Sequence, residues 1–198
     1  MQTCSELTNL KLSSHSIDVS AVKAIVQYCP KLKTLDLASR DLQWSLLSIL
    51  SQQGLPLEIL SIFYIPNIPS AEAALSCSYA LSCIRTFDTE YLHQRGQDVN
   101  ILIAYMIGLT TLALDKRSHS YIPQFIKYCN KLTKLFLSCR VCVTDILAMS
   151  RVNPLLSSFY FFCLYGFTDA ILIELIQACP HLHTLHLLYE TDITDISI

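Results

Sequence analysis

The stretch Leu132-Thr-Lys-Leu135-Phe-Leu137 decides the fold, because its spacing of three apolar residues returns along the whole chain. The first apolar residues of the eight copies are Leu7, Leu32, Leu57, Ile84, Leu109, Leu132, Leu156 and Leu182. They are separated by 25, 25, 27, 25, 23, 24 and 26 residues. Such a sustained period indicates a chain of similar short units that stack on one another.

The second and third apolar positions predict a strand in every unit. These pairs are Leu10/Leu12, Leu35/Leu37, Leu60/Ile62, Phe87/Thr89, Leu112/Leu114, Leu135/Leu137, Phe159/Phe161 and Leu185/Leu187, in which only Thr89 is not apolar. Two apolar residues spaced by two give a short strand with one buried face. Helical periodicity follows each strand, as at Val22, Ile25 and Val26. The predicted helix caps are Asp18, Asp41, Ser70, Asp98, Ser120, Thr144-Asp145 and Thr168-Asp169.

Strand and helix repeated in this order predict an α/β fold of the leucine-rich-repeat kind. We expect a horseshoe solenoid of about eight repeats with a parallel sheet on its concave face. A single solenoid should span residues 1–198, with repeats beginning near residues 4, 29, 54, 81, 106, 129, 153 and 179 and the last one incomplete. Neither end carries a polar capping element, so we expect a longer array or terminal repeats covered by another chain.

The stretch from Cys129 to Leu137, followed by Val143-Thr-Asp145, resembles the cysteine-containing leucine-rich repeat of F-box proteins and of antagonist-of-mitotic-exit-like proteins. Cysteine also stands three residues before the first leucine at Cys4, Cys29, Cys129 and Cys179. The resemblance implies the substrate-recognition solenoid of an F-box-like ubiquitin-ligase receptor, with ligase subunits as partners if an F-box lies outside this chain. The alternative is a stand-alone regulatory or structural protein that binds a partner competitively.

An F-box inside the chain is a weaker interpretation of one segment. Leu55-Pro-Leu-Glu-Ile-Leu-Ser-Ile-Phe63 looks like the opening of an F-box, but it is one residue short before Ile62. The missing residue would rotate its apolar side chains off a common helical face. The same residues fit the third repeat without adjustment.

Composition excludes several classes of function. Of the 198 residues 52% are hydrophobic and 15% are charged, with a net charge of −2, which gives no electrostatic signature for nucleic acid or an anionic membrane. The longest uncharged stretch, from Val152 to Thr168, is short and interrupted, so no membrane span is expected. Nine scattered cysteines without a signal peptide indicate reduced, buried thiols and a cytoplasmic or nuclear protein.

Catalytic, metal and cofactor sites are not expected. His181, His183 and His186 are close in sequence, but strand phase separates His186 from His181. Cys139 and Cys142 resemble half of a zinc site without a second pair at the required spacing. With no phosphate loop either, we expect a binding protein and not an enzyme.

The candidate site lies on the concave face, where repeat phase assigns the residues between the apolar positions. The predicted partner-binding residues are Asp88, Glu90, Asp115, Phe136, Tyr160, Phe162, Phe63 and His186. They divide into an acidic zone of Asp88, Glu90 and Asp115 and an aromatic zone led by Phe136, Tyr160 and Phe162. Aromatic side chains dominate binding energy, and flanking charges set the preferred sign of the partner. We expect a basic, partly apolar protein or peptide as the partner. The alternative is an ordinary surface in which another segment or a partner chain covers the aromatic side chains.

Overall fold

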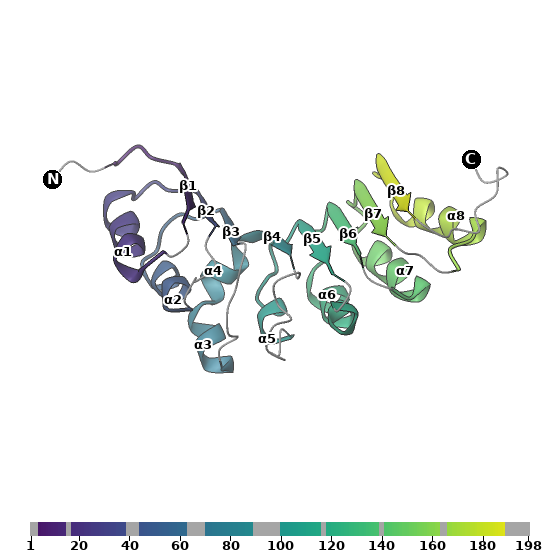
Figure 1. The fold of residues 1–198 in the computed structure, drawn as a ribbon, viewed down its shortest axis with the longest axis horizontal. Coiled ribbons are helices and arrows are strands. Elements are labelled where there is room, and N and C mark those ends of the chain that lie inside the picture. The colour runs from purple at the N-terminus through teal and green to yellow at the C-terminus, as the bar shows by residue number, and fades with distance from the viewer. Residues whose placement is uncertain are drawn as a thin grey trace. The chain divides into compact units, whose positions relative to one another are not determined.

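The computed structural model describes residues 4–14, 17–38, 44–62, 70–88, 100–115, 118–138, 141–162 and 166–188. Its contacts divide the chain into two compact units. Unit 1 comprises Met1–Phe87 and Tyr91–Gly108, and unit 2 comprises Asp88–Glu90 and Leu109–Ile198. Each unit alternates strands and helices along the chain (Figure 1). The α/β class with parallel strands is therefore confirmed.

Unit 1 contains four strands and five short helices among its described residues. In chain order they are β1 (Asn9–Ser13), α1 (Val19–Tyr28), β2 (Thr34–Ala38), α2 (Trp44–Gln52), β3 (Ile59–Ile62), α3 (Ala71–Ser76), α4 (Ser78–Ser82), β4 (Ile84–Asp88) and α5 (Asn100–Ile103). Neighbouring strands pair in parallel, with Leu35 opposite Leu10 and Leu60. Within the segment resembling an F-box opening, Ile59–Ile62 form strand β3, as the repeat interpretation predicts.

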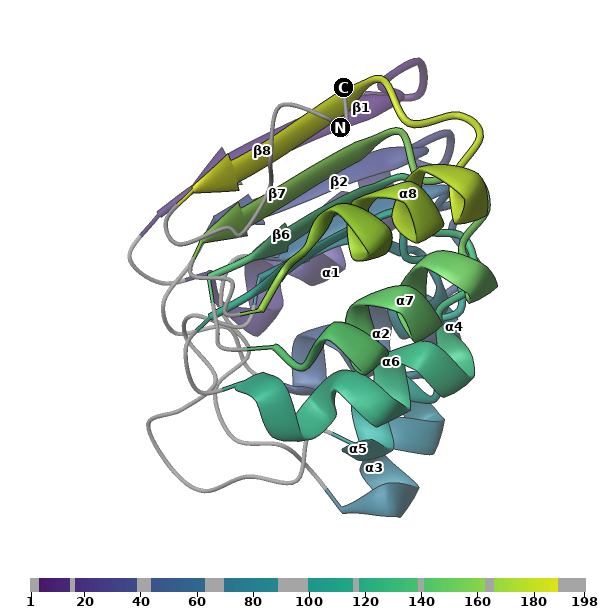
Figure 2. The same ribbon diagram turned by 90° about the vertical axis from the view of Figure 1, so that its right-hand side faces the viewer.

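Unit 2 repeats the same alternation of strands and helices. Its elements are β5 (Thr111–Leu114), a 3-10 helix (Ser118–Tyr121), α6 (Ile122–Tyr128), β6 (Lys134–Leu137), α7 (Val143–Val152), β7 (Ser158–Phe162), α8 (Asp169–Ala178) and β8 (Thr184–Leu188). Figure 2 shows α6, α7 and α8 together on one side of strands β6, β7 and β8. The opposite side of these strands carries no described helix.

The core of each unit lies between its strands and its helices. Leu35 and Leu37 of β2 and Leu135 and Leu137 of β6 are fully buried, as the spacing of the apolar residues predicts. Residues between them, such as Phe136, are only partly buried and stand on the other face. Strand alternation therefore sorts the chain into a buried leucine face and an accessible face that can hold a site.

The cysteine position of the repeat turns out to be the C-cap of a helix. Cys29, Cys129 and Cys179 each end a helix by donating their backbone N–H to the preceding turn, and all three are buried free thiols. Burial raises the pKa of Cys129 to about 12. Asn153 occupies the same position in the seventh repeat, which the sequence pattern missed. Its side chain accepts from the Leu132 N–H at 2.8 Å and donates to the Met149 carbonyl at 3.0 Å, so it joins two repeats of unit 2.

One register prediction was wrong. Repeat phase placed Asp88 level with Ser61, but the structure pairs Ser61 with Thr86 and Leu60 with Ile84. Arg85 is therefore an extra residue in β4, as in a β-bulge. Ile84, predicted as the first apolar residue of its repeat, is thus level with Leu60, the second apolar residue of the preceding one.

Helix starts were predicted with mixed success. Asp18 caps α1 by accepting from the Ala21 N–H at 2.8 Å, and Ser70 caps α3. Ser120 was wrong, because it lies inside the 3-10 helix that precedes α6. Thr168 is the N-cap residue of α8, whereas Thr144 and Asp145 lie in the first turn of α7 and Cys142 stands at its N-cap. Asp41 and Asp98 lie outside the described residues.

Burial falls at the first and last described strands. Leu7, Leu10 and Leu12 around β1 are only partly buried, and so are Leu182, Leu185 and Leu187 around β8. The corresponding leucines of β2 and β6 are fully buried. The sequence-based expectation that something covers the terminal repeats stays a prediction, as does the single solenoid over residues 1–198. None of the described helices is long and apolar enough to cross a membrane.

Candidate binding face on strands β5 to β8

An aromatic ladder runs across three adjacent strands of unit 2. It consists of Phe136 on β6, Tyr160 on β7 and His186 on β8, which are in register with one another. The ring centroids of Phe136 and Tyr160 are 4.4 Å apart with planes inclined by 9°. Those of Tyr160 and His186 are 4.9 Å apart and inclined by 16°. Three of the predicted site residues are thus brought together in one continuous stack.

The spacing of the strands explains why these rings stack. Neighbouring strands lie about 4.7–4.9 Å apart, and in-register side chains of parallel strands project side by side. That separation is close to the ring distances observed, so each ring lies flat against the next. Both faces of Tyr160 are covered in this way. Tyr160 therefore presents its ring edge, and not a ring face, away from the sheet.

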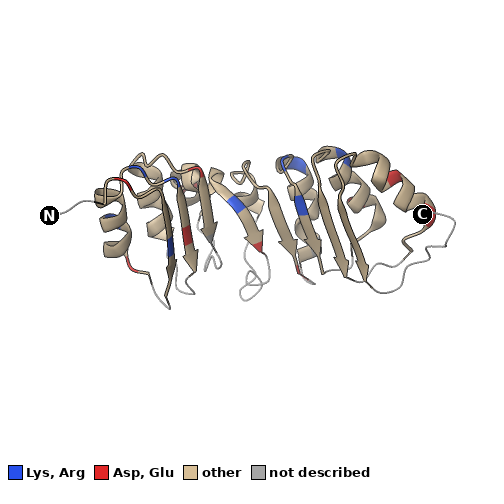
Figure 3. Ribbon diagram, turned by 90° about the horizontal axis from the view of Figure 1, so that it is seen from above, with Lys and Arg blue, Asp and Glu red and all other residues tan. Residues whose placement is uncertain are grey.

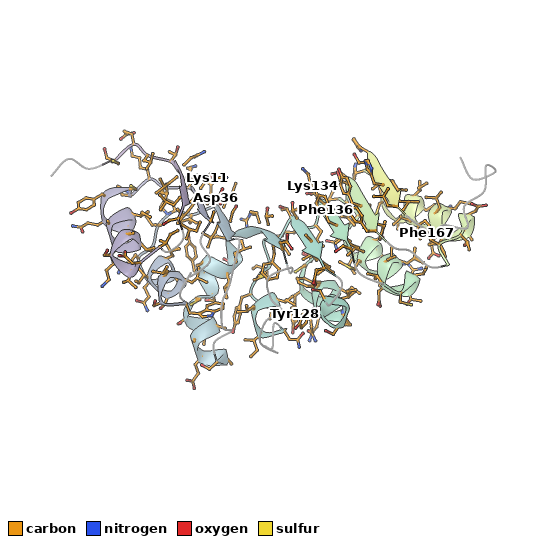
Figure 4. The ribbon with its side chains drawn as sticks, viewed as in Figure 1. Lys11, Asp36, Tyr128, Lys134, Phe136 and Phe167 are labelled. Atoms are coloured by element: carbon orange, nitrogen blue, oxygen red, sulfur yellow. The ribbon has the colours of Figure 1, made fainter. Side chains whose placement is uncertain are left out.

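The ladder is flanked along the strands by a polar row and an apolar row. The polar row consists of Thr111, Lys134, Ser158 and Thr184, which are in register across β5 to β8. The apolar row contains Phe162 and Leu188, in register at the ends of β7 and β8 and 38% and 41% exposed. Strands β7 and β8 carry no Lys, Arg, Asp or Glu, and they are uncoloured in Figure 3. Figure 4 shows Lys134 and Phe136 on the side of β6 away from the helices.

Lys134 is the exposed charge beside the ladder. Its in-register neighbours are Thr111 and Ser158, which offer hydroxyl groups and no carboxylate. Within the described part of the chain no ion pair is made by Lys134. In unit 1 the outward-facing strand lysine, Lys11, stands in the row that corresponds to Phe136 and contacts Asp36 at 2.9 Å.

The acidic zone is less complete than the aromatic one. Asp88 is exposed at the end of β4, and Asp115 is partly buried directly after β5, where it accepts a hydrogen bond from the Ser118 hydroxyl. Glu90 and Phe63 lie outside the described residues. Phe162 belongs to the same face as the ladder, but it occupies the apolar row and not the stack. The aromatic half of the predicted site is therefore the half that the structure assembles.

Metal ligands do not gather in the described residues, where His, Cys, Asp and Glu form no group of three. His181 and His183 are exposed before β8, and His186 lies in the ladder. Cys142 is an exposed free thiol, and Cys139 lies outside the described residues. The chain matches no family model, and no curated protein sequence is significantly similar to it. The geometry of this face is therefore the basis on which a function can be proposed.

Proposed function

We propose that this chain is a non-catalytic protein-interaction module that binds a protein or peptide on the outer face of strands β5 to β8. The observation that carries the proposal is the stack of Phe136, Tyr160 and His186 on adjacent strands. Aromatic side chains already held by stacking lose little conformational freedom on binding, and they supply most of the energy at interfaces. The exposed Phe162 and Leu188 extend the apolar area beside them.

Removal of the ladder tests this proposal. The variant Phe136→Ser/Tyr160→Ser and wild type are compared as baits in quantitative affinity purification from cells. Proteins that bind this face should be depleted at least tenfold with the ladder variant. The matched control is Lys11→Ser/Asp36→Ser, which removes the corresponding pair from unit 1 and should retain them. Equal recovery with all three baits, each folded by circular dichroism, would refute a binding role for this face.

The finer proposal is a leucine-rich-repeat solenoid that holds substrates for an F-box-like ubiquitin ligase. Its support is the resemblance carried by Cys129–Leu137, together with the strand and helix order of both units. The alternative is a stand-alone solenoid that competes for its partner. Co-purification of the ligase adaptor with the protein expressed from its native transcript would favour the receptor. A stable partner without the adaptor would favour the competitor.

The sign of the partner's charge is a separate question. A basic and partly apolar partner was expected from Asp88, Glu90 and Asp115, and this stays a prediction for that end of the face. The charge that stands next to the ladder is instead the ammonium group of Lys134. The residues of β6 to β8 therefore need their own argument.

A further inference from the structure

We propose that strands β6 to β8 bind an acidic, partly apolar protein segment, with its carboxylate held beside Lys134 and its apolar side chain against Phe162 and Leu188. The inference rests on the proposed function of this face and specifies the chemistry of the partner there. Three independent observations support it. They are the covered ring faces, the unpaired cation and the gradient from polar to apolar rows.

The covered ring faces disfavour a cationic ligand. A cation is attracted to the negative face of an aromatic ring, whereas the ring edge carries partial positive charge. Tyr160 is stacked on both sides, at 4.4 Å by Phe136 and at 4.9 Å by His186, so no cation can reach its face. The accessible edges attract anionic and apolar groups instead. The same coverage leaves Tyr160 without a free face on which a nucleobase could stack.

Charge complementarity at Lys134 points to a carboxylate. Among the described residues on the outer face of β6, β7 and β8, Lys134 is the only Lys, Arg, Asp or Glu. The neighbouring hydroxyl groups of Thr111 and Ser158 can donate hydrogen bonds to an anion. In unit 1, Lys11 has Asp36 as its partner from the next strand. Lys134 lacks that internal partner, so an acidic side chain of a ligand can take its place.

The three rows also give the ligand a direction. Lys134 lies in the row before the ladder, and Phe162 and Leu188 lie in the row after it. Rows separated by four residues along a strand lie roughly 13 Å apart, at about 3.3 Å per residue. A segment that crosses the ladder from β6 toward β8 therefore meets a cation, then ring edges, then an apolar pair. An acidic residue followed by a large apolar residue satisfies all three.

Selection from a displayed library of random linear peptides tests the inference on the full chain. Peptides are selected on wild type, resynthesised, and measured by fluorescence anisotropy against Lys134→Glu, Phe136→Ser/Tyr160→Ser and the unit 1 control Lys11→Glu. The recovered peptides should be enriched in Asp or Glu together with an apolar or aromatic residue. Their affinity should fall about tenfold with Lys134→Glu and stay within about twofold with Lys11→Glu. Each variant is first shown by circular dichroism to be folded under the conditions of the binding assay.

Charge reversal of the peptide completes the test. A peptide with Lys in place of its acidic residue should bind Lys134→Glu better than wild type, because the pair is restored with opposite signs. Peptides that need the ladder but carry no acidic residue, or bind Lys134→Glu equally well, would overturn the acidic partner and leave the proposed function intact. Recovery only of peptides that bind the ladder variant unchanged would overturn both. Ladder-dependent binding of a short oligothymidine, without an acidic peptide consensus, would replace the protein partner by a nucleic acid.

Discussion

The two units have the same strand geometry but differ in the side chains that stand between the second and third apolar positions of each repeat. In unit 1 the row contains Lys11 and Asp36, which neutralise each other across adjacent strands. In unit 2 the corresponding row contains Phe136, Tyr160 and His186, which stack without any internal charge partner. The repeat thus fixes where a side chain stands, and the residue type decides whether the row is satisfied within the chain or remains available to a partner.

The largest expected loss of stability comes from placing a charge in the buried leucine layer, and it should be equal in the two units. Leu35→Asp in β2 and Leu135→Asp in β6 both place a carboxylate in the fully buried layer between strands and helices. Burial of an uncompensated charge should cost about 4 kcal/mol or more, enough to unfold the protein. Urea denaturation followed by circular dichroism measures the loss. Phe136→Ser, one residue from Leu135 on the other face, is the matched control and should remain folded. Equal losses for Leu135→Asp and Phe136→Ser would mean that the two faces have been assigned wrongly.

Substitutions at the helix C-caps should cost less stability, and by different amounts in the two units. Asn153→Ala removes both hydrogen bonds that join the sixth and seventh repeats and leaves the buried Leu132 N–H without an acceptor. The cost should be about 2–3 kcal/mol in the free energy of unfolding. Cys29→Ala at the same position in unit 1 loses only a small buried thiol and should cost about 1 kcal/mol. If the two variants have the same urea midpoint, the side chain of Asn153 does not hold the repeats together.

Substitutions in the two rows should lower the free energy of unfolding by modestly different amounts. Phe136→Ala removes a partly buried ring and its stack on Tyr160, at a cost of about 1–2 kcal/mol. Lys11→Met removes an ion pair in which the lysine is 70% exposed, so the cost should stay below about 1 kcal/mol and shrink as salt is added. Urea titrations at low and high salt distinguish the two. A salt-dependent loss for Phe136→Ala would show that its role is not packing.

The sequence predicts the strands well because their signal is local. Alternate leucines such as Leu135 and Leu137 fix a buried face, and a shared phase then aligns Phe136 with Tyr160. Repeat phase alone predicts that the residues of the ladder lie level with one another, but it does not predict that their rings stack. The bulge at Arg85 was missed because register depends on pairing with another strand. Asn153 was missed because only its hydrogen bonds reveal that it replaces the cap cysteine.

What the sequence could not supply is the state of each charged group. Lys11 and Lys134 look alike as strand lysines, and only their cross-strand neighbours separate them. Asp36 pairs with Lys11, whereas Thr111 and Ser158 flank Lys134. A site is therefore recognised here by which groups lack an internal partner, and that property belongs to the assembled sheet.

The smallest expected effect compares two exposed thiols, Cys4 before β1 and Cys142 at the start of α7. Hydrogen bonds from the side chain and backbone of Thr144 lower the pKa of Cys142 from its ordinary value. At pH 7.5 a larger fraction of Cys142 is thus thiolate, and it should react with iodoacetamide several-fold faster than Cys4, as measured by peptide mass spectrometry.

The pH dependence of that ratio tests its cause. A thiolate of lower pKa is intrinsically a weaker nucleophile, so the advantage of Cys142 should shrink as the pH rises above the range in which its own thiolate forms. Thr144→Ala removes the hydroxyl donor, which lies 3.1 Å from the Cys142 sulfur, and should bring the two rates closer together. Cys129, whose pKa is raised to about 12 by burial, should react only when unit 2 unfolds. A rate ratio between Cys142 and Cys4 that is constant with pH would show that access, and not ionisation, separates the two thiols.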